Sequence, residues 1–263
     1  MSIDSINRRN FLTLAVAVVV APGRLLAAEP AARRSGYAVD VGLLYRMLNF
    51  RLEGTIEEHV DRVAGRYEIL SKGQGDRISS RVESKGVLRD GRWVPLRAAS
   101  YFEIYGRQSR TEIAYDHERR SAEYHARGET FLMRRLRVVD DVLAIPAGVR
   151  VDDAFSALLN YRDGLWSPDG QGRLMTHVVR RRHSDTEGPD EVASGYRAEL
   201  APLELTVAPD PESQKPAALL DLSRFSSWAR SDKPARIVFD GERRPTLITG
   251  PLILGSSLSI RLS

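Results

Sequence analysis

The chain has 263 residues and a formal net charge of +4, with 42% hydrophobic, 28% charged and 7% aromatic residues. This composition excludes an intrinsically disordered chain, a collagen-like chain and an integral membrane protein. The sequence contains no cysteine, which excludes disulfides, cysteine nucleophiles, cysteine-ligated zinc and iron–sulfur clusters.

The first residues carry a pattern typical of twin-arginine export. Arg8 and Arg9 are followed, after one residue, by Phe11 and Leu12. An uncharged apolar stretch over residues 13–21 comes next, and it is too short to cross a bilayer about 30 Å thick as a helix. We therefore expect export by the twin-arginine route, with an uncleaved amphipathic start as the alternative.

Two small residues, Ala27 and Ala28, follow the apolar stretch. We expect cleavage near Ala27 or Ala28, a signal peptide over residues 1–28, and a periplasmic bacterial protein. Residues 29–263 contain no long linker and no repeat of solenoid length. We therefore expect them to form a single β-rich domain without a transmembrane segment.

The net positive charge becomes smaller once the signal peptide is removed. Residues 1–28 hold three arginines and one aspartate, so their loss lowers the net charge from +4 to +2. A surplus of two charges among so many is weak evidence for a polyanionic partner. We expect a solvated surface of mixed sign and no nucleic-acid partner.

Apolar residues at alternate positions predict strands along most of the chain. The predicted strands cover residues 37–43, 50–63, 66–71, 78–84, 86–89, 92–96, 100–105, 110–115, 121–126, 174–179, 196–200, 203–207, 235–239, 245–248 and 253–262. Turns recur about every ten residues, and Asp90-Gly91 is a typical two-residue hairpin turn. This spacing is typical of an antiparallel meander. We expect a mainly β fold, either a strongly curved antiparallel sheet or an open barrel-like meander, with one or two short helices.

One helix is predicted over residues 152–162. An aspartate pair at its start offers an N-cap, and Phe155, Leu158 and Leu159 lie at i, i+3 and i+4 on one face. A second short helix is predicted over residues 219–229, after a proline-rich loop.

Five segments spread over most of the mature chain resemble a known family. They are Tyr37 to Leu43, Gly86-Val-Leu-Arg-Asp-Gly-Arg-Trp-Val-Pro95, Asp153-Ala-Phe-Ser-Ala-Leu-Leu-Asn-Tyr-Arg162, Arg236 to Pro245 and Gly250 to Ser259. Together they are similar to the domain of unknown function 3108 family of bacterial periplasmic proteins. The resemblance implies a β-rich periplasmic fold of unassigned activity and carries over no catalytic residue.

The chain carries no recognisable motif for a cofactor or for catalysis. No G-x-G-x-x-G opens a helix, and the Walker, H-E-x-x-H, G-x-S-x-G and S-x-x-K patterns do not occur. The histidines, which are His59, His117, His125, His177 and His183, lack a spacing that would bring three ligands together. Adjacent carboxylates on a strand face opposite sides and cannot act as an acid–base couple. We expect no catalytic residue, no cofactor and no metal site.

Two basic runs are the remaining unusual feature. Strand alternation would place Arg135 and Arg137 on one face, and likewise Arg180 and Arg182. Because lipid headgroups and lipopolysaccharide phosphates are the polyanions available in the periplasm, these arginines are candidates for contact with an anionic surface. The alternative is a cationic sheet exterior balanced by neighbouring Glu and Asp.

Three functions are compatible with these observations. The first is a non-enzymatic periplasmic protein whose curved sheet holds an apolar or lipid-like ligand. Its candidate wall residues, for which plain core packing is the alternative, are Trp93, Tyr101, Tyr105, Phe155, Leu158 and Leu159. Tyr101 and Tyr105 lie four apart, so strand alternation places them on one face.

The second function is a structural or assembly factor whose edge strands pair with an envelope partner protein. The third, an uncharacterised hydrolase, is less favoured.

Overall fold

The computed structural model describes residues 31–43, 45, 47–130, 133–182, 190–225, 229–230, 232–253 and 255–263. The export motif, the expected cleavage site and His183 lie outside the described residues.

Fifteen strands form one sheet in this part of the chain, together with one α-helix. The first eight strands are β1 (Ala31–Leu43), β2 (Leu48–Asp61), β3 (Arg66–Gly75), β4 (Ile78–Arg89), β5 (Arg92–Ile104), β6 (Arg107–Asp116), β7 (Ser121–Glu129) and β8 (Leu136–Ala144). The remaining elements are β9 (Val151–Asp152), α1 (Ala154–Arg162), β10 (Arg173–Arg181), β11 (Ala198–Pro209), β12 (Pro216–Leu220), the 3-10 helix η1 (Leu222–Arg224), β13 (Ala235–Phe239), β14 (Pro245–Pro251) and β15 (Ser257–Leu262).

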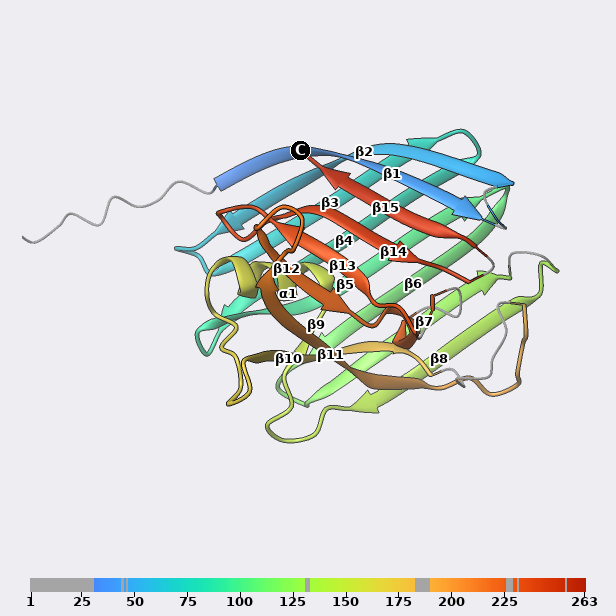
Figure 1. Cartoon of the computed structure of the whole chain (residues 1–263). Coiled ribbons are helices and arrows are strands. Elements are labelled where there is room, and N and C mark those ends of the chain that lie inside the picture. The colour runs from blue at the N-terminus through green and yellow to red at the C-terminus, as the bar shows by residue number, and fades with distance from the viewer. Residues whose placement is uncertain are drawn as a thin grey trace, which may run out of the picture.

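Neighbours in the sheet are mostly neighbours in the sequence. The order is β8-β7-β6-β5-β4-β3-β2-β1-β15-β14-β13-β12-β11-β10-β9, and the long-range step is the antiparallel pairing of β1 with β15 (Figure 1). Every other pairing is antiparallel as well, except the two-residue parallel contact of β9 with β10. The expected mainly β fold, an antiparallel and open barrel-like sheet, is confirmed.

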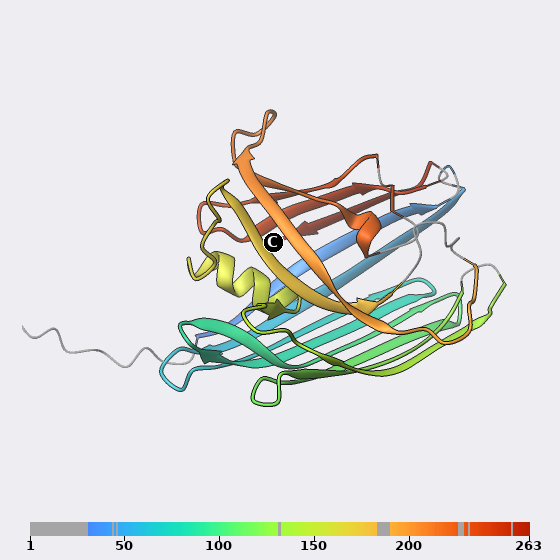
Figure 2. The same cartoon turned by 90° about the horizontal axis from the view of Figure 1, so that it is seen from below.

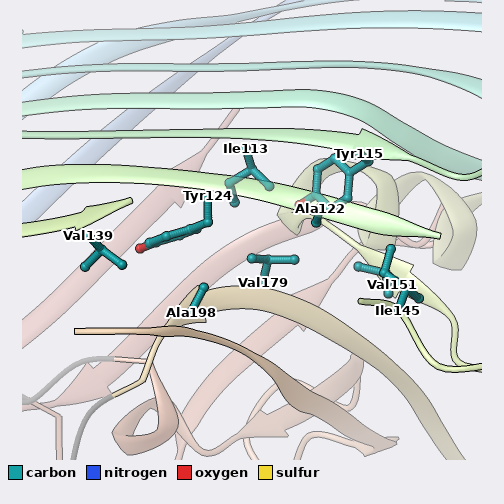
Figure 3. Packing of buried hydrophobic residues seen from close by; sticks show 9 residues of the cluster. All are labelled: Ile113, Tyr115, Ala122, Tyr124, Val139, Ile145, Val151, Val179 and Ala198. Atoms are coloured by element: carbon teal, nitrogen blue, oxygen red, sulfur yellow. The ribbon is translucent and has the colours of Figure 1, made fainter. Parts of the chain in front are cut away.

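The sheet curls until β10 and β11 face β7 and β8, but its two ends are not joined by a strand ladder (Figure 2). Asp141 of β8 bridges the gap. Its carboxylate accepts a hydrogen bond from the backbone nitrogen of Ala198 at 2.8 Å and pairs with Arg197 at 2.9 Å. Apolar side chains fill the same space (Figure 3), namely Ile113, Tyr115, Ala122, Tyr124, Val139, Ile145, Val151, Val179 and Ala198.

Two hairpin turns follow from their sequence. Asp90 and Gly91 have φ angles of 50° and 74°, and Tyr105 and Gly106 have φ angles of 51° and 70°. Two consecutive positive φ angles are the geometry of a type I′ turn, whose twist matches that of the flanking strands. The predicted Asp90-Gly91 hairpin is therefore confirmed.

Strands β4 and β5 are longer than predicted. Each joins two predicted strands, because the break between them is a β-bulge rather than a turn. The register shifts between Lys85 and Gly86, opposite Pro95. Proline has no N–H to donate to a ladder and is tolerated at a bulge. Glycine is required beside it, since a Cβ on Gly86 would lie 2.1 Å from the carbonyl oxygen of Val94.

Other boundaries also differ from the prediction. Strands β8, β9 and β12 were not predicted, and the second helix, expected over residues 219–229, is reduced to the three-residue η1 in the described chain. The main helix begins at Ala154 rather than at Asp152, since Asp152 belongs to β9 and Asp153 is the N-cap.

Helix α1 lies on the concave side of the sheet and connects its two halves. Leu159 packs with Tyr67 and Trp93 of the first half. Ala157 and Tyr161 pack in a second apolar cluster that includes residues of β10, β11 and β13. Burial on two sides explains why α1 is stable at nine residues, since tertiary packing rather than propensity holds short helices.

Candidate functional site

The start of α1 is fixed by a capping box. The backbone nitrogen of Ser156 donates to the Asp153 carboxylate at 2.7 Å, and the Asp153 nitrogen donates to the Ser156 hydroxyl at 3.0 Å. The predicted capping role is thus confirmed for Asp153. Ser84 of β4 also donates to Asp153, and Tyr67 bonds to the Ser84 hydroxyl at 3.0 Å. Burial raises the pKa of Asp153 above its usual range.

Asp152 has a different role, which the sequence reading missed. Its side chain is fully buried and accepts hydrogen bonds from Ser156 at 3.0 Å and Asn160 at 3.1 Å. It also accepts from Thr176 of β10 and pairs with Arg92 of β5. A buried carboxylate is stable only when charge and hydrogen bonds compensate it. Asp152 therefore holds α1, β5 and β10 together.

Asn160 extends this network by mimicking a strand neighbour. Its side-chain oxygen accepts from the backbone nitrogen of Trp93, and its nitrogen donates to the Trp93 carbonyl, both at 2.8 Å. One helical side chain thus satisfies two backbone groups of β5. The sequence did hold a signal for the role of Asp152. Two aspartates stand at the helix start, and only one of them can be the N-cap, so the other needs a different partner.

The end of α1 is held by Asp163. It accepts hydrogen bonds from the Trp93 indole at 3.0 Å, from Arg62 at 2.9 Å and from Arg162 at 3.2 Å. Burial alone would raise the pKa of Asp163, but these bonds outweigh it and lower the pKa. Arg162 also donates to Glu58 of β2 at 2.7 Å.

The opposite side of α1 lines a pocket of about 170 Å³ between the helix and strands β1, β2, β3, β14 and β15. We call it the α1 pocket. Its apolar lining consists of Ile56, Ile69, Phe155, Leu158, Leu159, Pro245 and Leu262, and its charged lining of Arg33, Arg162, Arg243, Arg244, Glu58 and Asp240.

The arginines of the α1 pocket differ in how they are paired. Arg162 binds Glu58, Arg244 pairs with Glu242, and Arg243 lies 5.7 Å above the ring of Tyr161. Arg33 of β1 forms no ion pair with any described residue, and its Nη1 is buried without a hydrogen-bond partner there. A buried donor left without a partner costs free energy until water or another group pairs with it.

The structure brings together half of the predicted wall. Phe155, Leu158 and Leu159 line the α1 pocket. Trp93 is 1% exposed and packs in the same apolar cluster as Leu159, with its ring 5.8 Å from that of Tyr67.

The two other tyrosines of the predicted wall lie elsewhere. Tyr101 pairs in register with Arg81 and Arg110 and lines a hollow on the face of the sheet away from α1. Tyr105 is in the β5–β6 turn, edge-on to Phe50 at 5.3 Å. The expectation that Tyr101 and Tyr105 share a face is wrong, because the strand and its alternation end at Ile104.

Three of the four arginines in the two basic runs have side chains with defined partners. Arg180 and Arg182 both pair with Glu199, so they do lie together. Arg137 donates to the backbone oxygen of Glu191 at 2.9 Å. Arg135 precedes β8, so strand alternation does not relate it to Arg137 as expected. Their contact with an anionic surface stays a prediction.

Within the described ranges, no group of three or more His, Asp or Glu side chains is arranged to hold a metal ion. His125 bonds to Asp140 at 2.8 Å, and His117 donates from Nε2 to the carbonyl of Pro95 at 2.6 Å. The helices of the described chain include none with the length and apolar character to span a membrane.

Comparison with known proteins identifies no family. No family model and no curated protein matches the chain. A solved beta-barrel-like protein of domain of unknown function DUF1849 from Brucella abortus is similar over 89% of this chain and 96% of its own, with 11% identity and a TM-score of 0.37. At this level the similarity supports no inference about function.

Proposed function

We propose that this protein is exported to the periplasm and there binds, without catalysis, a lipid-like ligand that carries an anionic group. The observation that carries the proposal is the α1 pocket, in which an apolar floor lies beside the unpaired guanidinium of Arg33.

The floor of the α1 pocket suits an alkyl chain. Its aliphatic and aromatic side chains come from α1 and from strands on both sides of the β1–β15 pairing. Burying apolar ligand surface against such side chains contributes about 25 cal/mol per Å². An apolar ligand therefore gains affinity here without any specific polar contact.

The rim of the α1 pocket suits a negative charge. Four arginines face two carboxylates in its lining, and a guanidinium presents a planar set of donors that matches a carboxylate or a phosphate. The buried Nη1 of Arg33 gains a partner if such a group binds.

The size of the α1 pocket restricts what it encloses. Its volume of about 170 Å³ is below the roughly 300–1,000 Å³ of sites that enclose a whole small molecule. We therefore assign to it one end of the ligand, with the remainder outside.

The periplasmic location rests on the twin-arginine pattern and on the resemblance to the domain of unknown function 3108 family. Replacing Arg8 and Arg9 together by Lys should leave the precursor in the cytoplasm. Normal export and cleavage of that variant would contradict the twin-arginine route.

Ligand binding is tested with a fluorescent dodecanoate and the same dye on dodecanol. The protein should bind the carboxylate probe more tightly than the alcohol. Phe155→Ala should weaken both probes at least fivefold, whereas Arg33→Gln should weaken only the carboxylate. Arg51→Gln is the matched control, because Arg51 is exposed on β2 and outside the α1 pocket. Binding that is unchanged in Phe155→Ala and Arg33→Gln would refute the proposal.

A second measurement identifies the natural ligand. Native mass spectrometry and organic extraction of protein purified from the periplasm should reveal a co-purifying lipid. A stoichiometric protein partner with no lipid would favour the assembly-factor function instead.

A further inference from the structure

A second pocket, separate from the α1 pocket, opens between the β4–β5 turn, the β6–β7 turn and the β8–β9 loop. It has a volume of about 230 Å³. Its lining is Arg89, Asp90, Arg92, Val94, His117, Arg120, Ile145, Val149, Arg150 and Val151. We call it the turn pocket.

The turn pocket is strongly cationic. Four arginines line it against one aspartate. Among the described residues, the guanidinium groups of Arg120 and Arg150 have no hydrogen-bond or ion-pair partner, and Arg89 approaches Asp90 only to 3.8 Å. Together with Arg92, these arginines bring guanidinium groups from three separate segments to the lining of one pocket. A bound anion would gain from the positive charge gathered there.

Arg92 supplies a donor group at the inner end of the turn pocket. Its side chain is 12% exposed, and its Nη2 pairs with the buried Asp152. Its Nε and Nη1 are buried and have no hydrogen-bond partner among the described residues. Because Asp152 anchors the guanidinium, Arg92 is held in one orientation before any ligand arrives.

The hollow on the outer face of β4–β8 is also rich in arginine, but most of its arginines are paired. It is larger, about 810 Å³, and is lined by five arginines. There Arg81 pairs with Glu83, Arg97 and Arg110 both pair with Glu112, and Arg134 pairs with Glu129. The turn pocket has no comparable set of acidic partners.

We propose that the turn pocket is a binding site for a phosphate group, either free or as part of a lipid headgroup. Guanidinium groups that approach from three segments can contact several oxygens of a tetrahedral anion, and arginine is the preferred residue for such contacts. The volume accommodates a phosphate and a short substituent. The site is independent of the α1 pocket and of the ligand proposed for it.

The test is calorimetric titration of the mature protein with inorganic phosphate, against sodium chloride of equal ionic strength. Phosphate should bind to one site. Arg120→Gln and Arg150→Gln should each weaken binding at least fivefold, and the double variant at least twentyfold. Both arginines lie outside the Asp152 network, so circular dichroism should show intact folds.

Two controls separate this site from general charge and from the α1 pocket. Arg127→Gln removes an exposed arginine from the outer hollow and should change phosphate affinity less than twofold. Phe155→Ala should also leave phosphate binding unchanged. Equal heats for phosphate and chloride, or equal losses in Arg127→Gln and Arg120→Gln, would overturn the proposal.

The source of the phosphate is distinguished by vesicle sedimentation. Vesicles of phosphatidylglycerol with phosphatidylcholine should bind the protein through the turn pocket if the source is a lipid headgroup, and the double variant should then lose sedimentation. If titration succeeds and sedimentation is the same in the wild type and the double variant, the site takes a free phosphate.

Discussion

The two long sides of α1 differ in how completely they are packed. Ser156 and Asn160, four residues apart, face a fully buried network centred on Asp152. Phe155 and Leu158 face the other way and remain half-buried, since they line the α1 pocket. The polar side determines where the helix lies, whereas the apolar side borders the α1 pocket.

The largest loss of stability is expected when Asp152, at the centre of the buried polar network, is replaced. Asp152→Ala deletes the partner of Arg92 and leaves a buried positive charge without compensation. We expect it to lower the free energy of unfolding by about 3–5 kcal/mol. Urea denaturation followed by circular dichroism measures the loss.

Asp140→Ala is the matched control for Asp152→Ala. Asp140 is an exposed aspartate on β8 that contacts His125, so its removal should cost less than about 0.5 kcal/mol. If the two variants are equally stable, the network does not anchor the helix.

The apolar side is tested by two adjacent leucines. Leu159 is 2% exposed and packed against Trp93, so Leu159→Ala should cost about 2–5 kcal/mol. Leu158 borders the α1 pocket and already lacks neighbours on one side, so Leu158→Ala should cost only about 1 kcal/mol. Equal losses in urea denaturation would indicate that the pocket side is as solidly packed as the core.

The stability of the protein at high pH depends on two buried tyrosines, Tyr67 and Tyr115, near the polar side of α1. Burial, and next the charge of Asp153, raises the pKa of Tyr67 and of Tyr115 above the usual value of 10.0. The unfolded chain loses these protons above pH 10 while the folded protein keeps them, so stability present below pH 10 is lost as the pH rises.

The expected loss is on the order of 1 kcal/mol per tyrosine between about pH 10 and pH 11. Urea denaturation across this range measures the slope, and tyrosinate absorbance shows whether ionisation accompanies unfolding. A flat stability profile above pH 10 would mean that both hydroxyls reach solvent in the folded protein.

The smallest expected change in stability comes from removing the hydroxyl of Tyr67 or of Tyr115, and the two variants should differ. Tyr67→Phe removes a bond to Ser84 and should cost about 1 kcal/mol. The Tyr115 hydroxyl is buried and has no partner among the described residues, so Tyr115→Phe should leave stability unchanged or raise it by up to about 1 kcal/mol. Thermal denaturation of the two variants side by side should show a loss for Tyr67→Phe and none for Tyr115→Phe, and a shared loss would place a partner on Tyr115.

The parts of the fold that were predictable depend on neighbours in the sequence. The Asp90-Gly91 turn and the Asp153 cap are local, because backbone conformation and a bond three residues away decide them. Strand β8 was missed because its inward position Asp141 is charged, which breaks the apolar alternation. The partners that make this charge acceptable, Ala198 and Arg197, arrive from a distant part of the chain.

The residues of the candidate site were also predictable only where neighbours in the sequence decide their position. Phe155, Leu158 and Leu159 were found because helical spacing alone puts them on one face. Tyr101 and Tyr105 were misplaced because the sequence does not mark the residue at which a strand ends and its alternation stops.

By itself, the sequence determined most of the strands, the tight turns and the main helix, because these depend on side-chain periodicity and on the φ angles that particular residues tolerate. The tertiary structure alone decided that β1 pairs with β15, and hence that Arg33 meets Arg244 and Leu262 in one pocket. It also decided that Asp152 meets Arg92 and Thr176. The physical reason is that alternation assigns a residue to a face, whereas the partner across that face depends on closing the whole sheet.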